Sequence, residues 1–384
     1  MTGPTAVPYR PGAAVPYRPG AAGSRRPGTA VLHRPSTVGE AVRVLAEVGD
    51  AELLAGGTDL VPAMRAGTRR PRAIVALRRV LELRARGVSA DALTIGAGVT
   101  YAELVDWAPA PGLVATARAV GSAQIRNAGT VGGALGSANP RGDLLTFLTA
   151  ADADVLTCSA RRGPRTTGLA DFLALAPGRR RGEIVTAVRM PPPRGPQAFL
   201  KIGGRQAAYP ALVSCALVID VAGGQVRCAV GGVATTPLRA EEAEAFATAE
   251  IDWSDIARSW RDAAGQQDMA PAGMSDGRDE AARAELARRF GALVAAAASA
   301  APSQLPEGPR DPAAYRWHAV GVLAERALAR CLTMTAKGAK ADSAKADSAK
   351  AERAKAELPK AELPKAVPPK AEQVKADGPE GRSW

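Results

Sequence analysis

The chain has 384 residues and a formal net charge of +12, and only 4% of its residues are aromatic. This length suffices for two or three domains. The ends carry seven of the twelve net charges: residues 1–28 contain four Arg and no acid, and residues 337–384 contain nine Lys and two Arg against eight acids. A body of only +5 with few aromatic side chains for base stacking predicts no nucleic-acid partner.

Both ends of the chain are predicted to be disordered. Residues 1–28 repeat the sequence Val-Pro-Tyr-Arg-Pro-Gly, and the segment from Lys337 onward repeats five residues of the type Lys-Ala-Asp/Glu-x-Ala/Pro. A period of five fits neither a helix nor a strand, and the prolines in the second repeat interrupt any helix. We therefore expect disordered extensions at 1–28 and 336–384.

The cysteines indicate a reduced, metal-free chain. The four residues lie far apart and form no CxxC pair, so no familiar pattern for zinc or an iron–sulfur cluster is present. We expect free thiols in a reducing cytoplasm.

The N-terminus lacks the apolar core of a signal peptide, and no apolar run approaches twenty residues, so we expect no membrane span.

The body opens with a predicted β-α-β unit. A helix over 37–48 begins with a capping box at Thr37 and Glu40, and a strand over 52–55 leads into a turn at Gly56 and Gly57. A helix over 58–66 and a strand over 73–77 complete the unit. The first N–H groups of that helix would face the turn, which is a common anion site.

The next region continues the alternation of strands and helices. Strands are predicted over 93–97, 153–158 and 183–190, and helices over 113–120, 143–151 and 169–175. A capping box at Thr100 and Glu103 predicts the start of a further helix after the strand over 93–97. A glycine-rich loop is predicted at 125–144, which holds five glycines. This order indicates an α/β architecture for residues 29–200.

The last region indicates an α+β domain. Strands over 209–222 and 225–233 form a predicted hairpin across Gly223 and Gly224. Residues 237–333 are predicted to be mainly helical, with a Gly/Met/Asp-rich interruption at 266–278.

The two glycine-rich segments lie about seventy residues apart, each at the end of an expected strand. Glycine allows close approach of a ligand to the backbone, and successive glycine N–H groups can form a concave nest that holds an anion. We interpret the two segments as opposite walls of one binding site for an extended, phosphate-bearing cofactor. Taken alone, either segment is more often a plain turn than a cofactor site.

Three motifs resemble a known family. The sequences Ala-Gly-Gly-Thr-Asp-Leu at 55–60, Thr-Ile-Gly-Ala-Gly at 94–98 and Ile-Arg-Asn-Ala-Gly-Thr-Val-Gly-Gly at 125–133 are similar to those of the FAD-binding medium subunit of molybdenum hydroxylases, of the carbon monoxide dehydrogenase and xanthine dehydrogenase type. The segment 228–239 resembles the start of that family's C-terminal domain, and the resemblance covers about residues 29–333.

The resemblance implies a fold and a division into domains. The fold is an α/β FAD-binding region of two small subdomains (a PCMH-type flavoprotein fold), followed by an α+β C-terminal domain with a small antiparallel sheet and helices. The subdomains would cover 29–82 and 83–204, and the C-terminal domain 205–335.

The resemblance also implies a set of FAD-binding residues and no catalytic residue or metal ligand in this chain. The first turn would hold the pyrophosphate, the second segment would line its other side, Asp143 would bind a cofactor hydroxyl, Ile184 or Val185 would pack on a ring, and Lys201 would lie near the flavin or its phosphate. The set is Ala55, Gly56, Gly57, Thr58, Asp59, Thr130, Val131, Gly132, Gly133, Ala134, Asp143, Ile184, Val185 and Lys201.

Some of these positions have simpler interpretations. Asp59 could act only on the dipole of the following helix, and Arg126 and Asn127 could hold the glycine-rich segment without touching a cofactor. The chain also departs from the family at Ala134, where Asn or Asp is common, and at Ser137, where His is common. Lys201 is the only lysine before residue 337, which favours a specific role for its point charge.

The resemblance implies an electron-transfer role in a cytoplasmic heterotrimer or its dimer. A partner small subunit would carry [2Fe–2S] clusters, a large subunit would carry molybdopterin, and this chain's FAD would pass electrons to a small-molecule acceptor such as NAD, a quinone or oxygen. The alternatives are a stand-alone flavin oxidoreductase and a non-catalytic scaffold that has lost FAD.

Overall fold

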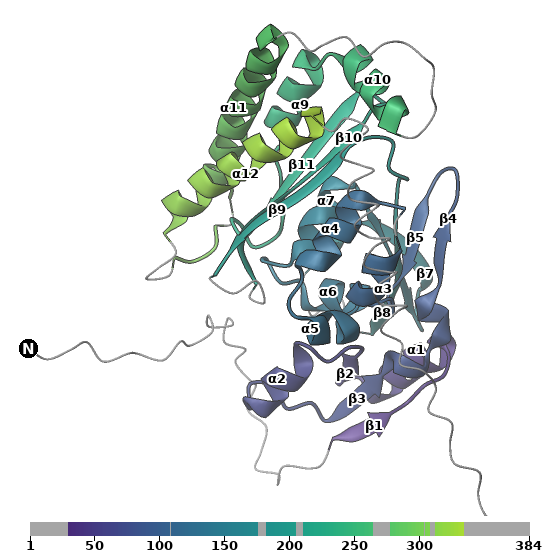
Figure 1. Cartoon of the computed structure of the whole chain (residues 1–384). Helices are drawn as coiled ribbons and strands as arrows, with labels where there is room; N and C mark the ends of the chain where they lie inside the picture. The colour runs from purple at the N-terminus through teal and green to yellow at the C-terminus, as the bar shows by residue number, and fades with distance from the viewer. Residues whose placement is uncertain are drawn as a thin grey trace, which may run out of the picture.

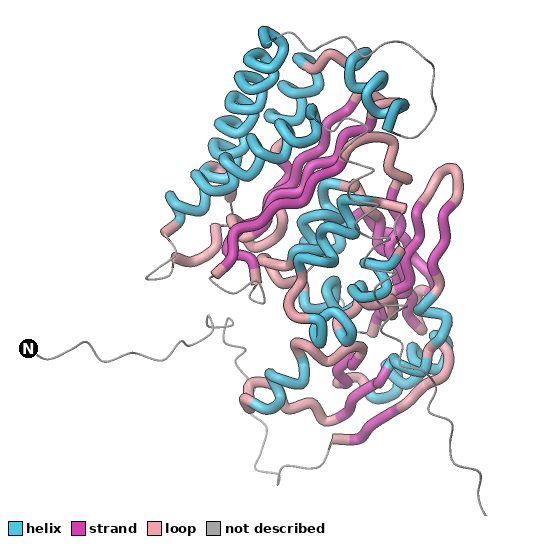
Figure 2. The backbone as a smooth tube through the Cα atoms, viewed as in Figure 1, coloured by secondary structure: helices cyan, strands magenta, loops and turns pink. Residues whose placement is uncertain are grey.

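The computed structural model describes residues 30–107, 109–175, 182–204, 210–263, 277–302, 304–307 and 312–333. The two predicted disordered ends, the first residue of the predicted hairpin and residues 266–276 of the predicted interruption lie outside these ranges. The described residues form three sheets, each with its own helices (Figures 1 and 2).

The first sheet is parallel and has the strand order β1-β3-β2. Its elements are β1 (Val31–His33), α1 (Val38–Val48), β2 (Ala51–Leu54), α2 (Leu60–Arg65), β3 (Ala73–Ala76) and two 3-10 helices, η1 (Leu77–Arg79) and η2 (Leu81–Arg84). The predicted β-α-β unit is confirmed as β2-α2-β3. The core of this unit includes Ile184 from the second sheet, so the two units share buried surface.

The second sheet has the order β4-β5-β8-β6-β7, and every pair of neighbours is antiparallel. Its elements are β4 (Arg86–Val88), β5 (Leu93–Gly96), α3 (Tyr101–Asp106), α4 (Pro111–Ala119), α5 (Ala123–Ala128), α6 (Val131–Ser137), α7 (Asp143–Ala150), β6 (Asp154–Ser159), β7 (Gly163–Gly168), α8 (Leu169–Ala174) and β8 (Glu183–Met190). Helix α6 packs on β5 and β8, helix α8 packs on β6 and β7, and α3, α4 and α7 add buried apolar residues to the same core.

The third sheet is antiparallel, with the order β12-β11-β10-β9, and has helices on both faces (Figure 1). One face packs with α7 and α4 in the second core, and the other packs with α9, α11 and α12 in a separate core. Its elements are β9 (Gln197–Gly203), β10 (Ala211–Asp220), β11 (Gln225–Gly231), β12 (Leu238–Arg239), α9 (Glu241–Glu250), α10 (Trp253–Ala263), α11 (Gly277–Ser299) and α12 (Ala313–Thr333).

The predicted hairpin is confirmed by β10 and β11, but β9 also belongs to this sheet. The domain boundary predicted at 204/205 therefore separates β9 from its hydrogen-bonded partner β10. The division into domains stays a prediction. No helix in the described ranges is both long enough and apolar enough to cross a bilayer.

The prediction of a loop at the glycine-rich segment is wrong: the segment consists largely of the helices α5 and α6. Both helices start at hydroxyl N-caps, because Ser122 accepts the N–H of Ile125 and Thr130 accepts the N–H of Gly133. These caps and the surrounding packing outweigh the low helix propensity of glycine.

The capping boxes differ from each other. In α3 the reciprocal box of Thr100 and Glu103 is complete, as predicted. In α1, Thr37 caps the helix, but the Glu40 carboxylate accepts the N–H of Ser36 at 2.8 Å. The predicted box at α1 is therefore only half formed.

Two glycines bring the helices α11 and α12 into backbone contact. A Cβ atom on Gly321 would lie 2.8 Å from the carbonyl oxygen of Gly291, and one on Gly291 would lie 2.6 Å from the carbonyl oxygen of Gly321. Real Cβ atoms do not approach backbone so closely. Neither position can therefore gain a side chain unless the helices separate.

We expect Gly321→Ala to lower the free energy of unfolding by about 1–3 kcal/mol, because overpacking forces the two helices apart. The control is Gly39→Ala in α1, where the new Cβ meets only Thr37 Oγ1, at 4.0 Å. This exposed helical position should gain about 0.5–1 kcal/mol. Urea unfolding of the full chain measures both. Equal shifts for the two variants would contradict the close helix contact.

Candidate functional site

The turn that follows β2 lies directly against the glycine-rich segment. A Cβ atom on Gly56 would lie 1.8 Å from the carbonyl oxygen of Ala128 and 3.1 Å from Cα of Gly129. The next residue, Gly57, has a φ of +73°, a conformation that L side chains rarely adopt. The two segments that were predicted to form opposite walls of one binding site are therefore in contact. Glycine is required at both positions of the turn.

The turn leaves several backbone donors available. Among the described residues, the N–H groups of Gly57, Thr58 and Asp59 have no hydrogen-bond acceptor. Asp59 is the N-cap residue of α2 but makes no side-chain cap bond, and it is exposed. Its position at the helix start agrees with the simpler interpretation of a dipole interaction, and a direct ligand contact stays a prediction.

The second segment uses its N–H groups internally. Gly132 donates to the carbonyl of Ala97 at 2.7 Å, Gly133 donates to Thr130 Oγ1 at 3.1 Å, and Ala134 donates to the carbonyl of Thr130 at 3.0 Å. A nest of free glycine N–H groups is therefore absent here, and that part of the prediction is wrong. Gly132 instead allows close packing, since its Cβ would lie 2.7 Å from that of Ala97.

The buried residue Asp143 and the half-buried residue Lys201 form an ion pair. Lys201 Nζ lies 2.7 Å from Asp143 Oδ2, and the side chains are 15% and 6% exposed respectively. Lys201 also donates to the carbonyl oxygen of Ala119 at 2.6 Å. The second carboxylate oxygen, Asp143 Oδ1, is buried and has no hydrogen-bond partner among the described residues. Burial raises the pKa of Asp143, and the Lys201 ammonium opposes that shift.

Tyr101 belongs to the same neighbourhood, although the sequence analysis missed it. It is 9% exposed, and a Cβ on Gly129 would lie 2.9 Å from its ring. Burial, and then the charges of Asp143 and Asp59, raise the pKa of its phenol well above the usual range. The ring therefore lies within electrostatic range of both carboxylates. It occupies an ordinary apolar position of a capped helix, so no sequence signal distinguishes it.

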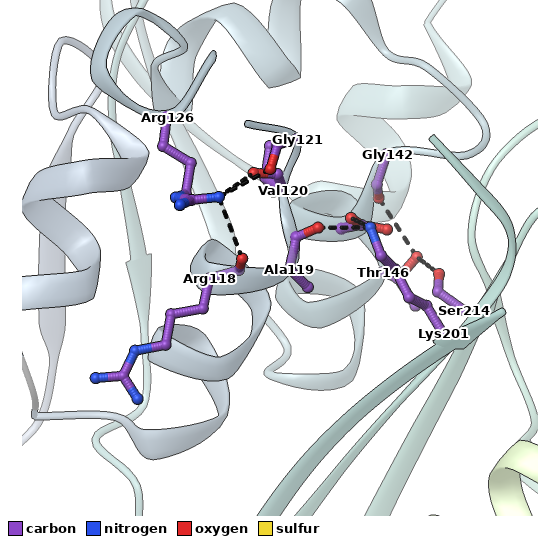
Figure 3. Close-up of polar contacts among 10 residues, drawn as sticks. Arg118, Ala119, Val120, Gly121, Arg126, Gly142, Thr146, Lys201 and Ser214 are labelled. Carbon is purple, nitrogen blue, oxygen red and sulfur yellow. Dashed lines mark hydrogen bonds and ion pairs between the residues drawn. The ribbon is translucent and has the colours of Figure 1, made fainter. Parts of the chain in front are cut away.

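Two cations hold the C-terminal end of α4 (Figure 3). Arg126 Nη1 donates to the carbonyls of Gly121 at 2.8 Å and Val120 at 3.1 Å, and more weakly to that of Arg118 at 3.5 Å. Lys201 donates to the carbonyl of Ala119, which lies between Arg118 and Val120 in the chain. The last carbonyls of a helix lack intrahelical partners and attract positive charge, so this arrangement is favourable. Arg126 thus bonds to backbone carbonyls, as the simpler interpretation expected, but to those that precede the glycine-rich segment, and whether it also touches a cofactor stays a prediction.

The two candidate ring contacts on β8 differ in exposure. Ile184 is 1% exposed and packs in the core of the first unit with Val42 and Val75. Val185 is half-buried and packs beside Val80 and Leu83. Successive residues of a strand point to opposite faces, so only one of the two could face a given ring. The ring contact itself stays a prediction.

Together these features suit a ligand that carries both phosphate and hydroxyl groups. The turn after β2 presents N–H donors of the kind that bind phosphate oxygens. The partnerless Asp143 Oδ1 is an acceptor that a ligand hydroxyl could satisfy. The described ranges bring the two segments, Tyr101 and the ion pair into one continuous neighbourhood.

We expect Arg126→Met to lower the free energy of unfolding by about 2 kcal/mol, because it removes charge-assisted hydrogen bonds at the end of α4. The matched control is Arg118→Met on α4 itself, whose exposed side chain points away from these carbonyls (Figure 3). That change should shift the unfolding free energy by less than about 0.5 kcal/mol. Denaturant unfolding compares them, and similar losses would show that the carbonyl contacts contribute nothing.

Comparisons with known proteins agree on one family. The sequence model of a family described as "FAD binding domain in molybdopterin dehydrogenase" matches residues 26–193. The glyceraldehyde dehydrogenase medium chain of Sulfolobus acidocaldarius is 32% identical over 214 residues, which cover 53% of this chain and 76% of the relative. The carbon monoxide dehydrogenase medium chain of Afipia carboxidovorans is 33% identical over 223 residues, which cover 54% and 75%.

The fold agrees as well. A solved structure of carbon monoxide dehydrogenase from Hydrogenophaga pseudoflava matches with a TM-score of 0.63 and 25% sequence identity, over 81% of this chain and 100% of that chain. This match confirms the predicted fold class. The chain therefore belongs to the family of FAD-binding subunits of molybdopterin dehydrogenases, which are oxidoreductases, and its cofactor is FAD.

Proposed function

We propose that this chain is the electron-transfer subunit of a heteromeric molybdenum hydroxylase. Its FAD would receive electrons from [2Fe–2S] clusters of a partner subunit and pass them to an external acceptor. The observation that carries this proposal is the contact of Gly56 with the carbonyl of Ala128. This contact joins both family motifs into one site beside a buried carboxylate oxygen that lacks a partner.

The residues present fit FAD. The N–H groups of the turn, Gly57, Thr58 and Asp59, would hold the pyrophosphate, with Ala55 and Gly56 shaping the turn. Thr130, Val131, Gly132, Gly133 and Ala134 would line the opposite side as packing surface rather than as donors. Asp143 Oδ1 would accept a hydrogen bond from a cofactor hydroxyl, and Val185 is the more exposed of the two candidate ring contacts on β8.

The bound cofactor supplies the redox chemistry, since a flavin can take up one or two electrons. The protein supplies binding and orientation. Lys201 has Asp143 and Ala119 as its hydrogen-bond acceptors, so the flavin contact predicted for it would have to use its remaining N–H group. Tyr101, with its raised pKa, would stay a neutral phenol at physiological pH.

The partners follow from the same proposal. We expect an iron–sulfur small subunit, a molybdopterin large subunit and a small-molecule acceptor, within the cytoplasm. Support comes from the relatives, whose names describe them as medium chains of dehydrogenases, and from a matching structure that is described as a Cu,Mo-CO dehydrogenase. The scaffold alternative, in which the chain has lost FAD, would require that the turn and Asp143 hold no ligand.

The test of the site is the visible absorption spectrum of the purified chain after addition of FAD and removal of the excess. We expect flavin bands for the wild type and their loss in Gly56→Ala, whose Cβ would displace Ala128 from the turn. Gly136→Ala in α6 is the matched control, because its Cβ meets nothing within 4 Å, and it should keep the bands. A colourless wild type would favour the scaffold.

A further inference from the structure

We propose that Lys201 is a positioning residue of the FAD site, which acts through Asp143. By occupying Oδ2, Lys201 orients the carboxylate and leaves Oδ1 as an ionised acceptor for a hydroxyl group of the cofactor. This inference rests on the proposed function. It assigns to Lys201 a role at the carboxylate, beside the contact with flavin or phosphate that the family resemblance implied.

The geometry fixes the ammonium from two elements. Lys201 Nζ lies 2.6 Å from the carbonyl oxygen of Ala119, at the end of α4, and 2.7 Å from Asp143 Oδ2, at the start of α7. Its own strand, β9, is hydrogen-bonded to β10, where Lys201 pairs with Ser214. With α4, α7 and β9 all joined at one nitrogen, the carboxylate cannot rotate without breaking the pair.

The free oxygen of the pair points to a ligand. Asp143 is 7% exposed, and its Oδ1 is a buried acceptor that no described residue satisfies. Buried polar atoms in folded proteins nearly always have a partner, so an exception calls for a functional explanation. Lys201 engages only the other oxygen, Oδ2.

The charges around the carboxylate support an ionised state maintained by Lys201. Among the described residues, Lys201 on β9 and Tyr101 on α3 are the ionisable groups whose interaction with Asp143 is resolved. On the α4 side the neighbour is the Ala119 carbonyl, and on the β10 side Ser214 bonds to Thr146 of α7. Burial raises the pKa of Asp143, and Lys201 supplies the opposing charge, so without Lys201 the carboxyl would keep its proton to higher pH.

The test is FAD binding by the full-length chain between pH 5.5 and 8.5, measured by flavin fluorescence. We expect a nearly constant Kd for the wild type. Lys201→Met should bind about tenfold more weakly at the low end of this range and recover as pH rises, because a charged acceptor forms the stronger hydrogen bond. Lys201→Arg should restore the constant Kd, and Asp143→Asn should bind weakly at every pH.

Thermal unfolding at each pH separates positioning from simple loss of structure. In Lys201→Met the folded-state pKa of Asp143 lies further above its unfolded value, so the folded state binds more protons. Stability is then greatest at low pH and falls as pH rises through that window. A purely structural defect would therefore weaken FAD binding as pH rises, which is opposite to the trend that positioning requires.

The remaining outcomes are decisive. Two results for Lys201→Met would overturn the role of Lys201 and leave the proposed function intact. One is a Kd for FAD equal to that of the wild type, and the other is a Kd raised by the same factor at every pH. An Asp143→Asn protein with wild-type affinity does the same. A wild type that binds no FAD overturns the proposed function itself, and this inference with it.

Discussion

The site depends on a contact between backbones. The turn after β2 and the end of α5 approach so closely that a Cβ atom on Gly56 would lie 1.8 Å from a carbonyl oxygen. Only glycine permits this contact, which places the turn of the first unit directly against the helices of the second. The donors of the turn, the ring of Tyr101 and the carboxylate of Asp143 are near one another because these two units meet there.

The same neighbourhood is stabilised by charge placed at helix ends. Asp143 is the first residue of α7, where a negative charge is favoured, while Arg126 and Lys201 donate to the carbonyls of Val120 and Ala119 at the end of α4. The Lys201 ammonium thus forms hydrogen bonds at the ends of two helices, α4 and α7, at once. This arrangement explains how the carboxylate can be buried with one oxygen that no described residue satisfies: the helix dipole and the ammonium offset the cost of burying its charge.

Much of the fold could be predicted because its signals are local. The capped helix at Thr100, the strand over 183–190 and the hairpin across Gly223 follow from spacing and turn residues. The site was harder to predict because glycine has two uses that look identical in a sequence. At Gly57 it supplies a positive φ, whereas at Gly132 it supplies close packing inside a helix. Likewise, the pairing of Asp143 with Lys201 joins residues 58 positions apart, which no local pattern reveals.

The place of β9 in the third sheet has a consequence for how the flavin region can be divided. The match to the FAD-binding family ends at residue 193, and Lys201 follows it on a strand whose hydrogen bonds belong to the C-terminal sheet. A fragment cut at that point would keep both glycine-rich segments and the carboxylate but lose the cation that faces it. The C-terminal sheet thus supplies the cation that pairs with Asp143, so a transplant that is meant to keep this ion pair must include that sheet.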